Sequence, residues 1–159
     1  MSSRINTALL LCLGTVIALP ASILSAQQSS GATPAQQARL DHFHALGDAF
    51  KVIRDQTHSS TPDMAAIKKN AQIVNDASIG QERWFAKGTG PESGKTGALP
   101  AIWSKPDEFK AAQQLLAERA PKLLAAANTG NIAAVTAGFR EVGKACKNCH
   151  DNFRKPIKE

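Results

Sequence analysis

Four stretches of this chain of 159 residues carry apolar residues at three- and four-residue spacing, and this periodicity constrains the fold more than any other feature. Such spacing gathers the apolar side chains on one face of an α-helix. The four apolar stripes are Leu40, Phe43, Leu46, Gly47, Phe50 and Ile53; Met64, Ile67, Ala71 and Val74; Phe109, Ala112, Leu115, Leu116 and Ala120; and Ile132, Val135, Phe139, Val142 and Cys146. No strand pattern, hairpin signal or internal repeat accompanies them. The sequence therefore predicts an all-α fold.

Residues that cap or break helices mark the ends of the first two predicted helices. The first stripe predicts a helix over about 35–55. Thr61, Pro62 and Asp63 then signal a helix start, because Thr caps, Pro suits the first turn and Asp complements the positive helix terminus. The second helix is predicted to run from this signal to about residue 77.

The third and fourth predicted helices are marked in the same way. Ser104, Pro106 and Asp107 signal the start of the third helix, and Pro121 is expected to kink it. A glycine then interrupts the chain at position 130, the next residue is Asn131, a good cap, and the fourth helix continues to the end.

A glycine-rich segment separates the second helix from the third. Four glycines and Pro91 lie within residues 86–97, so no regular element is expected between about 86 and 103. The other links are short, which makes neighbouring helices antiparallel. We expect an antiparallel four-helix bundle with one long connection between helices two and three, and a bundle interior is suited to holding a cofactor.

The N-terminal segment has the layout of a secretory signal peptide. Arg4 precedes an apolar run over 8–19, Pro20 follows, and the small residue Ala26 offers a cleavage site. We expect residues 1–26 to be removed on export to the periplasm, with an uncleaved N-terminal anchor as the alternative. The remaining 133 of the 159 residues suit one domain, with a flexible lead-in over 27–34 and the four-helix bundle over 35–159.

The distribution of charge argues against a nucleic-acid-binding protein. The chain has 19 basic and 13 acidic residues, and removing the signal segment, which carries Arg4 and no acid, leaves 18 basic residues. A nucleic-acid binder clusters its basic residues on one face, whereas these are scattered among acids. The scattered lysines include Lys68, Lys69, Lys105, Lys110, Lys122 and Lys144.

Residues 146–150 read Cys-Lys-Asn-Cys-His, a C-x-x-C-H sequence of the kind that attaches c-type haem. On a helix, this spacing brings Cys146, Cys149 and His150 onto one face. The two thiols would then add to the two vinyl groups of one porphyrin, and the imidazole would reach the iron from the same side. We therefore predict one covalently bound haem c, with His150 as the proximal iron ligand.

Three other uses of this cysteine pair stay open at this point. A structural zinc site needs about four protein ligands, and the chain offers no second Cys or His pair at zinc-like spacing. A redox-active pair normally lies at the N-terminus of a helix that follows a strand, whereas this pair lies near the C-terminus of an all-helical chain. An ordinary disulfide is the third alternative in an oxidising compartment.

With these residues in view, the chain resembles the class II c-type cytochromes, the family that includes cytochrome c' and its low-spin relatives. The resemblance covers nearly all of the chain after the signal segment. It rests on the haem motif near the C-terminus of a four-helix chain, with three further patterns around it. These are Val142-Gly143-Lys144-Ala145 before the motif with Phe153-Arg154 after it, Thr96-x-Ala98-Leu99-Pro100-x-Ile102-Trp103, and Arg39-x-x-x-Phe43-x-x-x-Gly47.

The resemblance implies that the first helix covers the distal face of the haem and that Phe43 meets the open iron position. Low-spin relatives have Met at this position, and Phe cannot coordinate iron. The implied centre is therefore five-coordinate and high-spin. Met64, His42 and His44 are the alternative sixth ligands: Met more often fills gaps in cores, and the two histidines point away from Phe43 around the helix.

Three further residues are candidate haem contacts. Arg39 and Arg154 would pair with a haem propionate, because the guanidinium fork matches a carboxylate, with surface charge as the alternative for each. The resemblance also implies that Arg154 shields the proximal imidazole. Trp103 would pack on the haem edge, or else serve as a core aromatic.

Two functions follow for a protein of this kind, neither of them enzymatic. An open sixth position behind an apolar lid admits neutral diatomic gases such as nitric oxide, since nothing in such a pocket holds water. The alternative is a six-coordinate, low-spin one-electron carrier, which would need redox partner proteins. A homodimer through helices one and two is a further expectation.

Overall fold

The computed structural model describes residues 31–156, so the predicted signal peptide and its cleavage after Ala26 lie outside the described residues. The four long helices are α1 (Pro34–Thr57), α2 (Met64–Ala77), α4 (Pro106–Thr129) and α5 (Ile132–Phe153). A 3-10 helix, η1 (Gln81–Phe85), and a short helix, α3 (Ala101–Ser104), lie between α2 and α4. The described residues contain no strand, only an isolated bridge between Ala98 and Arg154.

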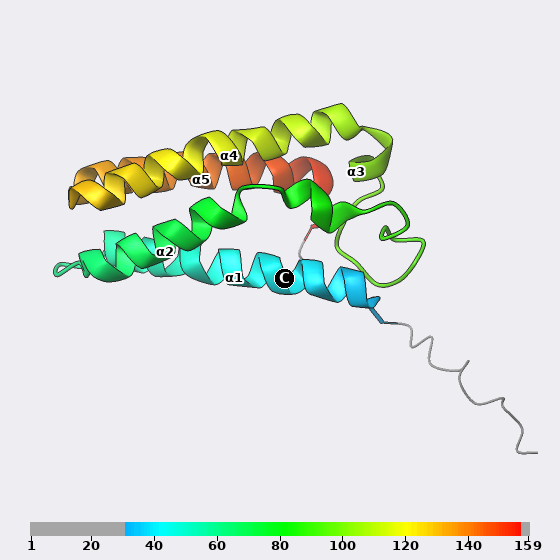
Figure 1. Ribbon diagram of the computed structural model, residues 1–159, viewed down its shortest axis with the longest axis horizontal. Helices are drawn as coiled ribbons and strands as arrows, with labels where there is room; N and C mark the ends of the chain where they lie inside the picture. The colour runs from blue at the N-terminus through cyan, green and yellow to red at the C-terminus, as the bar shows by residue number, and fades with distance from the viewer. Residues whose placement is uncertain (1–30, 157–159) are drawn as a thin grey trace, which may run out of the picture.

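The long helices form an antiparallel bundle, as predicted. Successive helices run in opposite directions, and α1 packs against α2 and α5 while α4 packs against α5 and α2 (Figure 1). The start of α1, the end of α5 and the connection between α2 and α4 all lie at the same end of the bundle (Figure 1). The site residues of α1 and α5 therefore meet beside this connection.

Helix α1 begins with a capping box, one residue before the predicted start. The Thr33 hydroxyl accepts a hydrogen bond from the Gln36 backbone N–H, and the Gln36 side chain accepts one from the Thr33 N–H at 2.9 Å. Gly31 belongs to the predicted lead-in, and its carbonyl accepts a hydrogen bond from the Lys95 N–H at 3.1 Å. The chain is thus tied to the connection before α1 begins.

The starts of α2 and α4 differ from the predicted ones. Asp63 rather than Thr61 caps α2, because its carboxylate accepts hydrogen bonds from two backbone N–H groups, those of residues 65 and 66, at 2.9 and 3.0 Å. Ser104 is the last residue of α3, and α4 begins at Pro106 without a side-chain cap. Helix α4 continues through Pro121 without a break, and Gly130 and Asn131 form the predicted turn into α5.

The prediction that residues 86–103 hold no regular element was wrong at its C-terminal end, where α3 forms. The indole of Trp103 donates hydrogen bonds to the carbonyls of Phe85 and Ala86, at 3.0 and 3.3 Å. Ile102 is buried between the connection and α4. These contacts stabilise a single helical turn that is too short to give a periodic pattern in the sequence.

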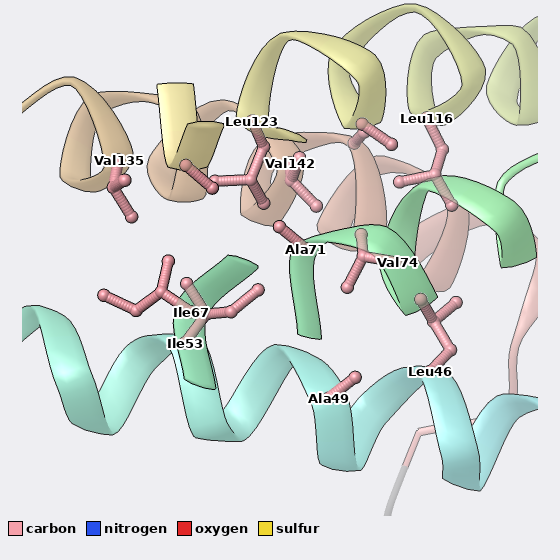
Figure 2. Packing of buried hydrophobic residues seen from close by; sticks show 13 residues of the cluster. Leu46, Ala49, Ile53, Ile67, Ala71, Val74, Leu116, Leu123, Val135 and Val142 are labelled. Carbon is pink, nitrogen blue, oxygen red and sulfur yellow. The ribbon is translucent and has the colours of Figure 1, made fainter. Parts of the chain in front are cut away.

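The main core lies between all four long helices (Figure 2). Its largest fully buried side chains come from every one of them, and Figure 2 shows them converging on the bundle axis. The buried members are Leu46, Ala49, Ile53, Ile67, Ala71, Val74, Leu116, Ala120, Leu123, Ala127, Val135, Val142 and Ala145. None of the helices within residues 31–156 is long and apolar enough to cross a membrane.

A second, smaller cluster lies at the connection end of the bundle and is rich in aromatic rings. Phe109 lies between Phe85 and Phe153, with ring centroids 4.9 and 5.1 Å away in edge-to-face geometry. Because Cys149 packs against the same cluster, these rings fix the last turns of α5 relative to the connection.

Candidate functional site

The C-x-x-C-H residues lie on the last turns of α5. Cys146, Cys149 and His150 are each half-buried, and all three line one cavity. Both cysteines are free thiols, so they do not form the disulfide that was one of the alternatives. The three side chains therefore share one face of α5, and that face borders the cavity.

The cavity has a volume of about 510 Å³ and lies between α1, α4, α5 and the connection. This volume falls within the range of cofactor pockets, about 300–1,000 Å³. Six of the seven residues singled out from the sequence line it, namely Arg39, Phe43, Cys146, Cys149, His150 and Arg154. Trp103 does not.

The wall formed by α5 has a low polarity, and this shows in its titratable groups. Burial raises the pKa of Cys146, and burial with the neighbouring Cys146 raises the pKa of Cys149 to about 11. Burial, followed by the positive charge of Arg154, lowers the pKa of His150. The imidazole is thereby favoured in its neutral form, which is the form that ligates a metal.

Phe43 lines the same cavity from α1. Its ring is half-buried and contacts two rings of η1, with centroid distances of 5.1 Å to Trp84 and 6.0 Å to Phe85. Because Phe43 and the three residues of the motif border the same cavity from different helices, they lie on separate walls of it.

The alternative sixth ligands have other positions. Met64 packs against the main core and does not line the cavity. His42 is exposed and stacks on Trp84 at a centroid distance of 4.7 Å. His44 does line the cavity, although it is exposed. Of the three, His44 alone has access to a group bound there.

Arg39 links α1 to the connection through hydrogen bonds. Only 4% of this residue is exposed, and its two terminal nitrogens donate four hydrogen bonds, to the Trp84 carbonyl, to the hydroxyl and carbonyl of Thr89, and to the Thr96 hydroxyl. Its guanidinium carbon also lies 4.8 Å from the Phe85 ring centroid. Burial lowers the pKa of Arg39. Among the guanidinium nitrogens, Nε alone makes no hydrogen bond within the described residues, so it is the one nitrogen left for a propionate.

Arg154 and Trp103 differ in how close they come to the cavity. Arg154 is exposed, lines the cavity, and directly follows α5, where the Phe153 carbonyl accepts a hydrogen bond from the Leu99 N–H at 3.0 Å. Trp103 lies behind the cavity wall, where it packs against the second cluster. The placement of Trp103 matches the alternative of a core aromatic.

Three buried glutamines at this end were not among the candidates taken from the sequence. Gln36 donates hydrogen bonds to the connection, including one to the Gly90 carbonyl at 2.7 Å, and Gln81 donates to the Ala77 carbonyl at 2.9 Å. Gln113 on α4 lines the cavity, and its Nε2 has no partner within the described residues. The Thr-x-x-Gln capping pattern would have signalled Gln36. No comparable sequence pattern points to Gln113.

The residues present fit a haem better than a zinc ion. Within residues 31–156, no group of three or more His, Cys, Asp or Glu side chains is placed to hold a metal on its own. The cavity instead offers two free thiols and one imidazole beside a largely apolar space, together with an unpartnered amide on Gln113. A covalently bound haem requires thiols that anchor the porphyrin and one axial donor for its iron, and this cavity has both.

Known proteins carry the same combination of fold and sequence. The family model for Cytochrome C' matches residues 34–154. Cytochrome c' of Rubrivivax gelatinosus is 34% identical over 118 residues, which are 74% of this chain and 91% of that protein. A carbon monoxide-bound variant of cytochrome c' from Alcaligenes xylosoxidans is 32% identical, with a TM-score of 0.70 over 79% of this chain and 99% of that one. The nitric oxide complex of another variant of that cytochrome is 31% identical, with a TM-score of 0.67 over 77% of this chain and 94% of that one. The chain therefore belongs to the cytochrome c' family of haem c proteins.

Proposed function

We propose that Cys146 and Cys149 each form one thioether bond with the haem and that His150 is its proximal ligand. One observation carries this proposal: both thiols and the imidazole line a single cavity of about 510 Å³ from one face of α5. The apolar surroundings keep the thiols protonated before reaction and the imidazole neutral. Each thiol would add across one vinyl group, so that the porphyrin is held from the α5 side.

We further propose that the haem is five-coordinate and binds small neutral gases opposite His150. Phe43 borders the cavity from α1 and offers no atom that ligates iron. Met64 packs against the main core and does not line the cavity. The carbon monoxide and nitric oxide complexes of the Alcaligenes xylosoxidans cytochrome support the same class of ligand for this chain.

The second candidate is a six-coordinate, low-spin electron carrier, and a specific observation favours keeping it. His44 lines the cavity from the same helix as Phe43. An imidazole is a strong iron ligand, and a permanent sixth ligand lowers the rearrangement that accompanies a change of oxidation state. In this alternative the protein would exchange electrons with redox partner proteins.

We place the protein in the periplasm on the strength of the signal-like segment over 1–26. Haem attachment through thiols requires the cysteine pair to be kept from forming a disulfide in that oxidising compartment. We propose no enzymatic activity, because an acid–base group beside the iron would have to come from His44, which is exposed.

Haem extraction tests the attachment directly. Replacing both Cys146 and Cys149 by Ser should leave haem that passes into acidified organic solvent, because no thioether then holds it. The single variants should each keep haem in the protein fraction through the remaining thioether. Haem that stays with the protein in the double variant would contradict the assignment of these two residues.

A further inference from the structure

Gly47 is a glycine in the middle of α1 for which the polypeptide itself gives no reason. A glycine inside a helix destabilises it relative to alanine, because glycine loses more conformational freedom on folding. Apart from its neighbours in the helix, no atom of the described residues lies within 4 Å of the position that a Cβ would take at Gly47. By contrast, a Cβ at Gly138 would lie 3.1 Å from the Cα of Leu123, which explains that glycine. Gly47 lines the cavity, so a side chain here would meet the group that fills it.

The contacts between α1 and α5 fix which residues of the two helices lie at the same level along the bundle. The Phe50 ring stacks on Phe139 at a centroid distance of 4.3 Å, and a Cβ at Gly143 would lie 3.7 Å from Cζ of Phe50. The two helices run in opposite directions (Figure 1). Gly47 is one turn nearer the connection than Phe50, and Cys146 is one turn nearer the connection than Gly143. Gly47 and Cys146 therefore lie at the same level, and both line the cavity.

The hydrogen bonds of the connection support this register. The Thr96 hydroxyl accepts a hydrogen bond from Arg39 of α1 at 3.0 Å, and the Thr96 carbonyl accepts one from Nζ of Lys155, just after α5, at 3.1 Å. Arg39 precedes Gly47 by eight residues, and Lys155 follows Cys146 by nine, so the two intervals agree to about one residue. The same pairing of levels thus holds at two separate places along the two helices.

This register places Gly47 between the attachment point of the haem and Phe43. Phe43 lies one turn beyond Gly47 on α1, and His150 lies one turn beyond Cys146 on α5. In the proposed attachment, Cys146 holds one edge of the porphyrin and His150 binds the iron at its centre. The porphyrin therefore passes Gly47 before it reaches the level of Phe43. A glycine lets the α1 backbone approach the flat ring closely, whereas any side chain would hold the helix away from it.

We infer that Gly47 packs against the porphyrin and thereby sets how closely α1, and with it the ring of Phe43, approaches the open iron position. Gly47 is thus a positioning residue for the gas site. The inference rests on the proposed function, because it concerns the same haem and the same iron position. A methyl group at position 47 would separate α1 from the porphyrin, so that Phe43 would obstruct a gas less.

Replacement of Gly47 tests this through stability and gas binding together. If nothing packed at this position, Gly47→Ala would favour folding about two- to fivefold, the ordinary difference between the two residues in a helix. With the porphyrin there, Gly47→Ala should instead lower the melting temperature of the haem-bearing protein, and Gly47→Val should lower it further. Carbon monoxide should bind to ferrous Gly47→Ala about two- to tenfold faster than to the wild type, the range expected from loosening the contacts of one aromatic ring.

Ala45→Gly is the matched control on the same helix. Ala45 is exposed and does not line the cavity, so this change should lower the stability by the helix preference alone. It should leave the association rate of carbon monoxide at its wild-type value. A gain of stability in Gly47→Ala that equals the loss in Ala45→Gly, together with unchanged carbon monoxide association, would overturn the inference.

A measurement on the unaltered protein covers the case in which the Gly47 variants do not fold. In the nuclear magnetic resonance spectrum of the ferrous carbon monoxide complex, the two Hα protons of Gly47 should show a large porphyrin ring-current shift, whereas the Hα of Ala45 should not. The absence of that shift at Gly47 would place α1 away from the porphyrin and contradict the inference. Failure of the wild-type protein to bind carbon monoxide at all would instead contradict the proposed function.

Discussion

Phe43 meets the ring of Trp84 edge to face, with 5.1 Å between the ring centroids and an angle of 89° between the ring planes. Phe43 is on α1, whereas Trp84 is on η1, a short helix that the periodicity of the sequence does not reveal. Edge-to-face pairs of this kind stabilise one relative orientation of the two rings. The position of Phe43 at the cavity therefore depends on how η1 is held.

Trp84→Ala should loosen Phe43 and speed the binding of carbon monoxide to the ferrous protein. An aromatic pair contributes about 0.5–1.5 kcal/mol beyond its buried area, which corresponds to a change of about two- to tenfold in the association rate if the ring must move aside. His42→Ala is the matched control, because it removes the other ring stacked on Trp84 and leaves the Phe43 contact in place. Rates that change equally in both variants would show that surface packing, and not Phe43, controls access.

Substitution of Phe43 itself should separate the two candidate functions. Phe43→Ala removes the ring at the cavity, so carbon monoxide should bind faster and more tightly, although truncating a Phe costs the fold up to about 3–5 kcal/mol. Phe43→Met supplies a thioether at the same place, and the ferric spectrum should change from high-spin to low-spin. If neither variant alters gas binding or spin state, Phe43 does not lie over the iron, and His44 becomes the leading candidate for a sixth ligand.

The parts of the fold that were predictable from the sequence are those set by local signals. Gly130 and Asn131 mark the turn between α4 and α5, because Gly130 adopts the left-handed conformation that ends α4 and the next residue, Asn131, caps α5 with its side chain. The haem motif is equally local, since its spacing alone places three side chains on one helix face. The all-α bundle followed from four such stretches together.

The features missed were those that depend on contacts between distant segments. Arg39 looks like any exposed arginine in the sequence, yet its partners Thr89 and Thr96 lie 50 and 57 residues away. Whether Trp103 faces a cavity or lies behind its wall is decided by its hydrogen bond to Phe85, 18 residues distant. A pattern of nearby residues carries no information about such pairings.

Arg39→Ala should destabilise the protein and release the connection from α1. It removes four hydrogen bonds of a buried cation, so a loss of at least about 3 kcal/mol in the free energy of unfolding is expected. Trypsin should then cleave faster after Lys87 and Lys95 under native conditions. Arg39→Lys should recover only part of the stability, because an ammonium group does not reproduce the planar fork.

Arg54→Ala provides the control on the same helix. Its side chain is 51% exposed and pairs with Asp55 at the surface, so its removal should change the free energy of unfolding by no more than about 1 kcal/mol. Equal losses in the Arg39 and Arg54 variants would mean that the contacts of Arg39 with the connection do not stabilise it.

The proposal of an open iron position is tested by the optical spectrum of the ferrous protein before and after addition of carbon monoxide, because this spectrum reports both the number of axial ligands and the access of a gas to the iron. We expect a five-coordinate, high-spin spectrum, with His150 as the single axial ligand, that converts fully to that of a carbon monoxide complex. A six-coordinate, low-spin spectrum that carbon monoxide leaves unchanged would contradict it. That result would make the protein an electron carrier.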